Sequence, residues 1–253
     1  MATYDYKAGK ARIVEILDGK LDVVRKDKLP KDSEFTYENA YQGWVTGIFV
    51  DIRNSTKLFS EDNKRVVSRL IRSFTSEIIE ILRLDGDSQQ DDSLREIGIR
   101  GDCVYGIYTT PTCGDEFEVA QKAFYINTFI EMLNNLLFVR GYPVIEVGIG
   151  VSSAIELVVK AGRNGVGINN LVWIGNAVTK ASKFSGLGNK NGNSCLVFSE
   201  ESYKFFINLL KMNNPNKNVE SWFGKKTDHD LGTYYTADIV MVEFDNWIGN
   251  GMR

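Results

Sequence analysis

The chain has 253 residues, of which 43% are hydrophobic and 25% charged, and its formal net charge at pH 7 is −3. This length allows one large domain with a full hydrophobic core, or one domain with small additions. The composition is ordinary for a soluble globular protein, the charge lacks the basic footprint of a nucleic-acid-binding protein, and no apolar run is long enough to span a membrane. We therefore expect neither nucleic acid nor a membrane among its partners.

The cysteines and the single histidine narrow the chemistry further. Cys103, Cys113 and Cys195 are an odd number without CxxC spacing, which predicts reduced thiols and no zinc site. The N-terminus lacks the apolar core of a signal peptide, so we expect a cytoplasmic protein. His229 is the only histidine, which disfavours catalysis or metal binding by histidine.

The chain begins with a charged extension, residues 1–40, in which Lys10–Leu17 can form a short helix. The main domain follows over residues 41–253. Its first element is a strand, Val45–Asp51, that is apolar up to the acid at its end. A long amphipathic helix follows from about Ser55, where Ser or Thr can cap it.

The rest of the chain continues to alternate between strands and helices. After a polar loop over Asp85–Asp92, the segment Leu94–Tyr108 predicts a hairpin with Gly101 and Asp102 in its turn. We expect the remaining elements in this order: helix Glu116–Val139, strand Val144–Ser152, loop Gly162–Asn170, strand Leu171–Ile174, helix Asn176–Phe184, strand Cys195–Phe198, helix Glu200–Met212, loop Asn213–Asn218 and a β-hairpin over Val219–Phe244 with its polar tip at Lys225–Leu231.

This order of elements predicts the fold class. The sequence β-α-β-β-α-β is that of a ferredoxin-like unit, so we expect an α+β fold with an antiparallel-rich sheet and a C-terminal β-hairpin. Helices should lie on one face of the sheet, and the opposite face must also be covered where it is apolar.

Two acids stand at the ends of apolar strands. Asp51 closes the first strand and Asp102 lies in the hairpin turn. Such a pair can share divalent ions, which suits in-line phosphoryl chemistry, and the free amides at the start of the next helix suit a phosphate. Asp51 can also cap that helix, and Asp102 can be an ordinary turn residue. The apolar runs that lead up to each acid favour the metal site.

Four blocks of sequence carry a resemblance to a known family. In chain order they are Phe49–Thr56, Arg100–Val104, Glu146–Ser152 and Trp173–Phe184. Together they resemble the catalytic domain of class III nucleotidyl cyclases over residues 41–245, whereas each block alone is a weak signal. The resemblance implies the class III cyclase fold, built on a βαββαβ unit.

The resemblance also implies roles for the residues around the two acids. Asp51 and Asp102 would hold two Mg²⁺ or Mn²⁺ ions, with the Ile52 carbonyl as a further ligand. The ribose 3′-hydroxyl would attack the α-phosphorus and expel pyrophosphate, in a homodimer with two composite sites. The nucleotide phosphates would lie in a cradle formed by the backbone of Arg53, Asn54, Ser55 and Thr56.

Other positions depart from the family pattern. The base-reading Lys and Asp of the purine cyclases align with Gly98 and Val172, whose side chains cannot hydrogen-bond a purine. The transition-state Asn and Arg align with Thr179 and Lys183. Thr179 can still form a hydrogen bond. Lys183 can neutralise a phosphate, though without a bidentate fork, or it can be a solvated helix charge.

The substrate expectation rests on a narrower resemblance. Gly43–Thr56, in a stand-alone chain, resembles the pyrimidine cyclases of Pycsar antiphage systems, which make cyclic UMP or cyclic CMP for a separate effector. We therefore expect UTP as substrate, ahead of CTP. Arg100 can donate to a pyrimidine carbonyl or point into solvent, and Lys225 and Lys226 can reach the triphosphate or form a polar hairpin tip. The alternatives are an adenylate or guanylate cyclase and a catalytically degenerate, regulatory relative.

Overall fold

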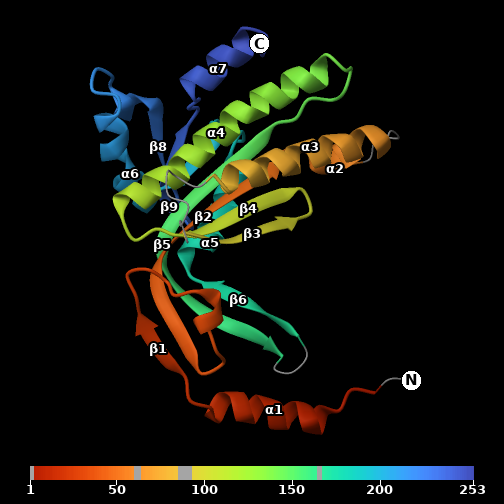
Figure 1. Ribbon diagram of the computed structural model, residues 1–253, viewed down its shortest axis with the longest axis vertical. Helices are drawn as coiled ribbons and strands as arrows, with labels where there is room; N and C mark the ends of the chain where they lie inside the picture. Colours follow the sequence, from red (N-terminus) through yellow and green to blue (C-terminus); the bar gives the residue numbers. More distant parts are fainter. Residues whose placement is uncertain (1–2, 60–63, 85–92, 164–166) are drawn as a thin grey trace.

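The computed structural model describes residues 3–59, 64–84, 93–163 and 167–253. Its centre is one sheet with the strand order β3-β4-β2-β5-β7-β9-β8, in which β1 also pairs with β2 and β6 with β5 (Figure 1). The pairs β1–β2 and β5–β7 are parallel, and the others are antiparallel. The strands are β1 Asp22–Arg25, β2 Asn39–Ile52, β3 Leu94–Arg100, β4 Cys103–Thr109, β5 Val147–Arg163, β6 Ile168–Ile174, β7 Leu196–Ser199, β8 Phe223–Asp228 and β9 Gly232–Ala237. The predicted α+β fold with an antiparallel-rich sheet is confirmed.

Helices cover both faces of this sheet. Three of them, α3, α4 and α6, bury their apolar sides on one face in the main core. On the other face α5 covers a second core that contains Val45, Ala177 and Ala181, together with Leu29 and Phe35 from the N-terminal segment. The helices are α1 Tyr6–Asp18, α2 Ser55–Phe59, α3 Lys64–Leu82, α4 Cys113–Phe138, α5 Asn176–Leu187, α6 Glu200–Met212 and α7 Val242–Gly249, with short 3₁₀ turns at Asp32–Glu34 and Val219–Trp222.

Local chemistry accounts for most helix boundaries. The predicted helix over Glu200–Met212 is confirmed, and Ser199 caps it by accepting the Ser202 N–H. The helix expected from Glu116 begins three residues earlier, at Cys113, because Thr112 and Asp115 form a reciprocal capping box there. The helix expected from Ser55 is present as α2 and α3, while residues 60–63 and the predicted loop at residues 85–92 lie outside the described residues.

The strand and loop boundaries around β5 were wrong. Both ends of the predicted loop Gly162–Asn170 are paired, since Gly162 lies opposite Asn169 and Ala161 opposite Asn170 in the β5–β6 ladder. Residues 164–166, in the middle of this predicted loop, lie outside the described residues. Both strands are longer than the sequence indicated, and β5 begins at Val147 rather than Val144. The many Gly and Asn residues favour a loop, but a partner strand decides the conformation, because strand propensity depends strongly on context.

The C-terminal hairpin is shorter than predicted. Pairing is confined to β8 and β9, and the last residues of the predicted hairpin belong to α7. Lys225 and Lys226 therefore lie within β8, opposite Tyr235 and Tyr234, and not at the hairpin tip. Sequence alternation alone does not show where a ladder ends.

The N-terminal segment adds a strand and a helix to the domain. The strand β1 was not predicted, and the helix expected over Lys10–Leu17 is present as α1. Gly9 is its only buried residue, and α1 lies apart from the packed helices (Figure 1). Among the described residues, no helix combines the length and apolarity needed to cross a bilayer.

Candidate active site

The structure brings the two strand-end acids together. Asp51, in β2, lies opposite Cys103, the residue after Asp102. Asp102 lies in the tight turn between β3 and β4, where Gly101 has a left-handed φ of +62°. Burial raises the pKa of the Asp51 carboxyl above its ordinary value; the Arg53 guanidinium opposes this shift, and the charge of Asp102 adds to it. The two carboxylates therefore act on each other across neighbouring strands.

The Arg53 side chain points into the protein. Its Nη2 donates to Asp51 Oδ2 at 2.7 Å and to the Ser185 carbonyl at 2.6 Å, and its Nη1 donates to the Gly186 carbonyl at 3.0 Å. The Arg53 backbone N–H donates to the Glu146 carbonyl at 2.7 Å. This differs from the expected phosphate cradle, because the Arg53 amide is already used. Arg53 instead joins Asp51 to the C-terminal end of α5.

A short helix begins two residues after Arg53. Asn54 reverses the chain with a φ of +54°, and α2 begins at Ser55. Amides in the first turn of a helix have no intrahelical acceptor. Within the described residues, the amides of Ser55 and Thr56 donate to no backbone carbonyl outside α2, so the expected phosphate cradle depends on them.

The acid pair fits a hard divalent cation. Carboxylate and carbonyl oxygens are the donors that Mg²⁺ prefers, and the mutual repulsion of Asp51 and Asp102 is the kind that a cation relieves. In the described part of the chain, no group of three or more His, Cys, Asp or Glu gathers as a metal site. An ion held here would complete its shell with the Ile52 carbonyl, water or substrate phosphates, as Mg²⁺ commonly does.

A hydrogen-bonded aromatic cluster lies at the predicted base-reading position. The Tyr105 ring crosses Gly98, so that a Cβ added there would lie 2.2 Å from the ring. Glu96 accepts a hydrogen bond from Tyr105 Oη at 2.7 Å and another from Trp173 Nε1 at 2.8 Å. The Tyr105 ring also stacks on Phe49, with 4.9 Å between ring centroids. The purine-reading position is therefore filled by a ring from the adjacent strand.

Sequence reasoning missed Glu96 and Tyr105 as candidate site residues. Each looks like an ordinary residue of a half-buried strand, and the only signal was the glycine at position 98. Arg100 is exposed at the end of β3, and its charge partly opposes the rise that burial causes in the pKa of Tyr105. Val172, which aligns with the other base-reading residue of the purine cyclases, is 40% exposed in β6.

Thr179 and Lys183 lie on the solvent side of α5. Both are exposed, whereas Ala177 and Ala181 face the sheet. The charges that act on Asp51 are those of Arg53, Asp102 and Lys190, whereas Lys183 acts on Asp228 of β8. The structure does not bring Lys183 to the acid pair of its own chain.

The two predicted triphosphate lysines have contacts of their own. Lys226 Nζ donates to the Gly192 carbonyl at 2.6 Å, which ties β8 to the loop after α5. Lys225 Nζ lies 6.0 Å from the centroid of the Tyr235 ring, a cation–π distance. Neither contact places a lysine beside Asp51 or Asp102.

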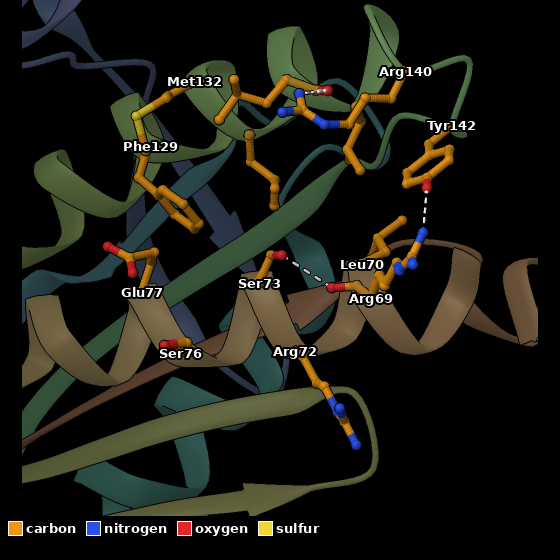
Figure 2. Close-up of a pocket in the computed structure, with 13 residues that line it drawn as sticks. Arg69, Leu70, Arg72, Ser73, Ser76, Glu77, Phe129, Met132, Arg140 and Tyr142 are labelled. Carbon is orange, nitrogen blue, oxygen red and sulfur yellow. Dashed lines mark hydrogen bonds between the residues drawn. The ribbon is translucent and has the colours of Figure 1, made fainter. Parts of the chain in front are cut away.

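A cavity of about 790 Å³ opens elsewhere, between α3 and α4 (Figure 2). Apolar residues of both helices line it, including Leu70 and Phe129, and Arg69 donates to Tyr142 Oη at 3.0 Å beside it. None of the predicted site residues lines this cavity. The predicted site is instead distributed over strand tips, a hairpin face and one helix surface.

Comparisons with solved structures define the class of the fold. The chain matches a class III adenylyl cyclase-like ATP-binding protein from Pseudomonas aeruginosa with a TM-score of 0.65 and 17% identity, over 98% of this chain and 50% of that one. It matches the adenylyl cyclase CyaB from P. aeruginosa with a TM-score of 0.59 and 16% identity, over 78% and 95%. The protein therefore has the fold of a class III nucleotidyl cyclase.

Sequence comparisons give the family within that class. No protein-family model matches the chain. It is 55% identical over 249 residues to a uridylate cyclase of Treponema porcinum, covering 98% of this chain and 82% of that protein. It is 28% identical over 253 residues to a uridylate cyclase of Gulbenkiania mobilis, covering 97% and 96%. The chain belongs to the uridylate cyclase family and is a nucleotidyl cyclase.

Proposed function

We propose that this protein converts UTP to 3′,5′-cyclic UMP and pyrophosphate with the help of divalent cations. The observation that carries the choice of base is the Tyr105 ring over Gly98, where the purine cyclases of the resembled class place a base-reading lysine. A Cβ at Gly98 would lie 2.2 Å from this ring, so no longer side chain fits unless the ring moves. Both relatives described above bear the name uridylate cyclase, which supports the same choice.

Glu96, Tyr105 and Trp173 form the hydrogen-bonded cluster described above, here called the base-side cluster. This cluster favours a base with a single small ring over a purine. Tyr105 and Trp173 both donate to Glu96, so each oxygen of this carboxylate already has a donor and the rings are held in place. A rigid aromatic wall limits the room for a base more firmly than mobile side chains would. Arg100, exposed at the end of the same strand, can donate to a uracil carbonyl.

The chain's own residues suggest how the reacting groups are held. Asp51, Asp102 and the Ile52 carbonyl would hold two Mg²⁺ or Mn²⁺ ions, which supply Lewis-acid stabilisation of the attacking oxygen and the phosphates. The amides of Ser55 and Thr56 would bind phosphate oxygens. The 3′-oxygen then forms a bond to the α-phosphorus, the bond to the β-phosphate oxygen breaks, and the 3′-hydroxyl proton leaves to solvent.

A second copy of the chain would complete the site. Lys183 lies on the exposed face of α5, and its charge acts on Asp228 of β8. A site that combines Lys183 with the acid pair would take the two acids from another chain. A symmetric homodimer gives each acid pair the α5 face of its partner and contains two composite sites. Thr179 and Lys183 would there stabilise the transition-state charge, and Lys225 or Lys226 would reach the triphosphate.

The role in antiphage signalling rests on resemblance alone. A cyclic pyrimidine nucleotide that acts as a messenger needs an effector that binds it. Incubating the product of this enzyme with candidate cyclic-nucleotide-binding effectors, and measuring effector activation against cyclic AMP, tests this link.

One assay tests the proposed reaction. The purified protein is incubated with Mn²⁺ and each of the four ribonucleoside triphosphates in turn, and the products are separated by chromatography. We expect cyclic UMP as the main product and none from the Asp102→Ala variant. Faster cyclisation of ATP or GTP under matched conditions would contradict the pyrimidine assignment, and no product from any nucleotide would favour a degenerate relative.

A further inference from the structure

The helix that carries Thr179 and Lys183 lies unusually close to the sheet. A Cβ added at Gly150 would lie 2.1 Å from the Ala181 carbonyl, and one at Gly148 would lie 2.1 Å from the Ser185 carbonyl. Backbone therefore packs directly on backbone along α5. A glycine surface fixes the height of the helix above the sheet, but it has no side chains to stop the helix sliding along its axis.

The N-terminal end of α5 is held by a carboxylate from the strand beneath it. Glu156, in β5, is fully buried, and its Oε1 accepts the Ala177 N–H at 2.6 Å. The N-cap residue, Gly175, has no side chain, and a Cβ there would lie 2.5 Å from Glu156 Oε1. Glu156 therefore does from a neighbouring strand what an N-cap side chain normally does from within the helix.

The opposite end of α5 is held by a cation. Arg53 donates to the carbonyls of Ser185 and Gly186, in the last turn of the helix. A negative group at the N-terminus and a positive group at the C-terminus both match the helix dipole. Two buried charges, both from outside the helix, therefore fix α5 at its ends.

Glu156 is a costly anchor. Its second oxygen, Oε2, is buried and accepts no hydrogen bond within the described residues. Burial raises the pKa of this carboxyl to about 7, although the Ala177 N–H opposes the shift. A buried, half-paired carboxylate costs free energy. A cost of this kind is expected where position matters more than stability.

We propose that Glu156 is a positioning residue of the cyclase reaction: its carboxylate anchors the first turn of α5 and so sets where Thr179 and Lys183 stand along the helix axis. This inference rests on the proposed roles of Thr179 and Lys183. Being buried beneath α5, Glu156 acts only through the helix. A shift of the helix by about 1 Å is enough to lower the rate on the order of a hundredfold.

The composite site offers a test that separates positioning from general damage. In mixed dimers, a site forms from the acids of one chain and α5 of the other. If Glu156 acts through α5, mixing Glu156→Ala with Asp102→Ala restores activity, because one site then has intact acids and an α5 whose anchors, Glu156 and Arg53, are both unchanged. Mixing Glu156→Ala with Lys183→Ala restores nothing, because every site has either a shifted or a mutated α5.

Single variants supply a second readout. Glu156→Ala should lower kcat by about 10- to 100-fold with little change in KM for UTP, since ground-state binding depends mainly on the other chain's amides and ions. Glu156→Gln keeps the Oε1 acceptor and should retain most of the kcat. Glu156→Asp keeps the negative charge, but its shorter side chain does not reach the Ala177 N–H in the same way. In mixed dimers it should therefore restore activity with the same partners as Glu156→Ala does.

Glu116→Gln is the matched control. Glu116 is also a fully buried glutamate, but it accepts hydrogen bonds from Thr46 and Ser153 on the face of the sheet away from α5. The Glu116→Gln variant should rescue both Asp102→Ala and Lys183→Ala.

Three results would decide against Glu156 as a positioning residue. They are rescue of Lys183→Ala by the Glu156 variant, failure to rescue Asp102→Ala in heterodimers shown to form, and an unchanged kcat. If Asp102→Ala and Lys183→Ala fail to rescue each other, the composite site is wrong, and the kcat and KM of the Glu156 variants alone decide the role of Glu156.

Discussion

Asp51 and Asp102 stand at strand tips that the ladder register places beside each other, whereas Thr179 and Lys183 stand on an exposed helix face. The acid pair is fixed by local chain geometry: one strand end and one two-residue turn. The positions of Thr179 and Lys183 depend on where the whole of α5 lies. They therefore depend on Glu156 and Arg53, the buried charged residues that bind its two ends. One half of the proposed site is thus preorganised within the chain, and the other lies on a separate helix face, where the proposed homodimer would use it.

The largest expected effect is the loss of activity when one acid of the preorganised pair, Asp51 and Asp102, is replaced. Asp51→Ala or Asp102→Ala should reduce cyclic nucleotide formation below detection, because substrate oxygens and water cannot replace a lost carboxylate ligand. Product chromatography measures the loss, and circular dichroism checks that the fold survives. Asp102→Ala is the cleaner variant, since Asp51 also accepts from buried Arg53. Turnover by the double alanine variant would sink the metal-site proposal.

Arg53 contacts both Asp51 of the acid pair and the last turn of α5. Replacing it should therefore impair both halves of the proposed site. Arg53→Ala leaves the Asp51 carboxylate and the α5 carbonyls of Ser185 and Gly186 without their donor. We expect a loss of roughly 3 kcal/mol in unfolding free energy, as for a broken buried ion pair, and failure to rescue either Asp51→Ala or Lys183→Ala. Denaturant unfolding and the mixing assay measure these effects. Arg53→Lys, which keeps the charge but loses the planar fork, should recover only part of each. Full rescue of either partner by Arg53→Ala would contradict the link.

The base-side cluster should set nucleotide preference without affecting assembly. Tyr105→Ala removes the ring over Gly98 and leaves Glu96 with one donor fewer. We expect the ratio of kcat/KM for UTP to that for ATP to fall by roughly 10- to 100-fold, equivalent to about 1–3 kcal/mol of discrimination. Tyr105→Phe keeps the ring and should retain most of the ratio. An unchanged ratio in the alanine variant would show that this ring does not limit the base.

The smallest predicted effect is the pH dependence of folding stability that comes from Glu156, the residue that anchors the first turn of α5. The raised pKa of Glu156, about 7 in the fold against an ordinary 4.5, means that the folded state binds a proton more tightly than the unfolded chain. The stability from this group is complete below about pH 4.5 and is lost as pH rises through about 7.

Glu156→Gln cannot titrate, so it isolates this effect. The melting temperature of the variant relative to the parent should rise by a few °C between pH 5 and pH 8, because about 1 kcal/mol shifts the Tm of a domain this size by roughly 2–4 °C. Scanning calorimetry at both pH values checks the sign, with Glu116→Gln as a control for general glutamate loss. A difference that shrinks with rising pH would contradict the assigned environment of Glu156.

The sequence alone determined the features whose signals are local. Apolar spacing located the helices that became α3, α4, α5 and α6, because one apolar face per helix is a periodic pattern. An apolar run ending in an acid located Asp51, and a Gly-Asp turn located Asp102. Four short blocks, each read along the chain, indicated the class of fold and enzyme.

Only the tertiary structure decided which distant residues meet. Glu156 reaches an amide 21 residues away, and Arg53 reaches a carbonyl 132 residues away. The two described ends of the predicted Gly162–Asn170 loop became strand, at Gly162–Arg163 and Ile168–Asn170, because each lies beside the other and can pair with it. The Tyr105 ring lies over Gly98 because the β3–β4 register places the two residues opposite each other. Contacts of this kind follow from strand register and helix placement, and no local pattern of residues records either.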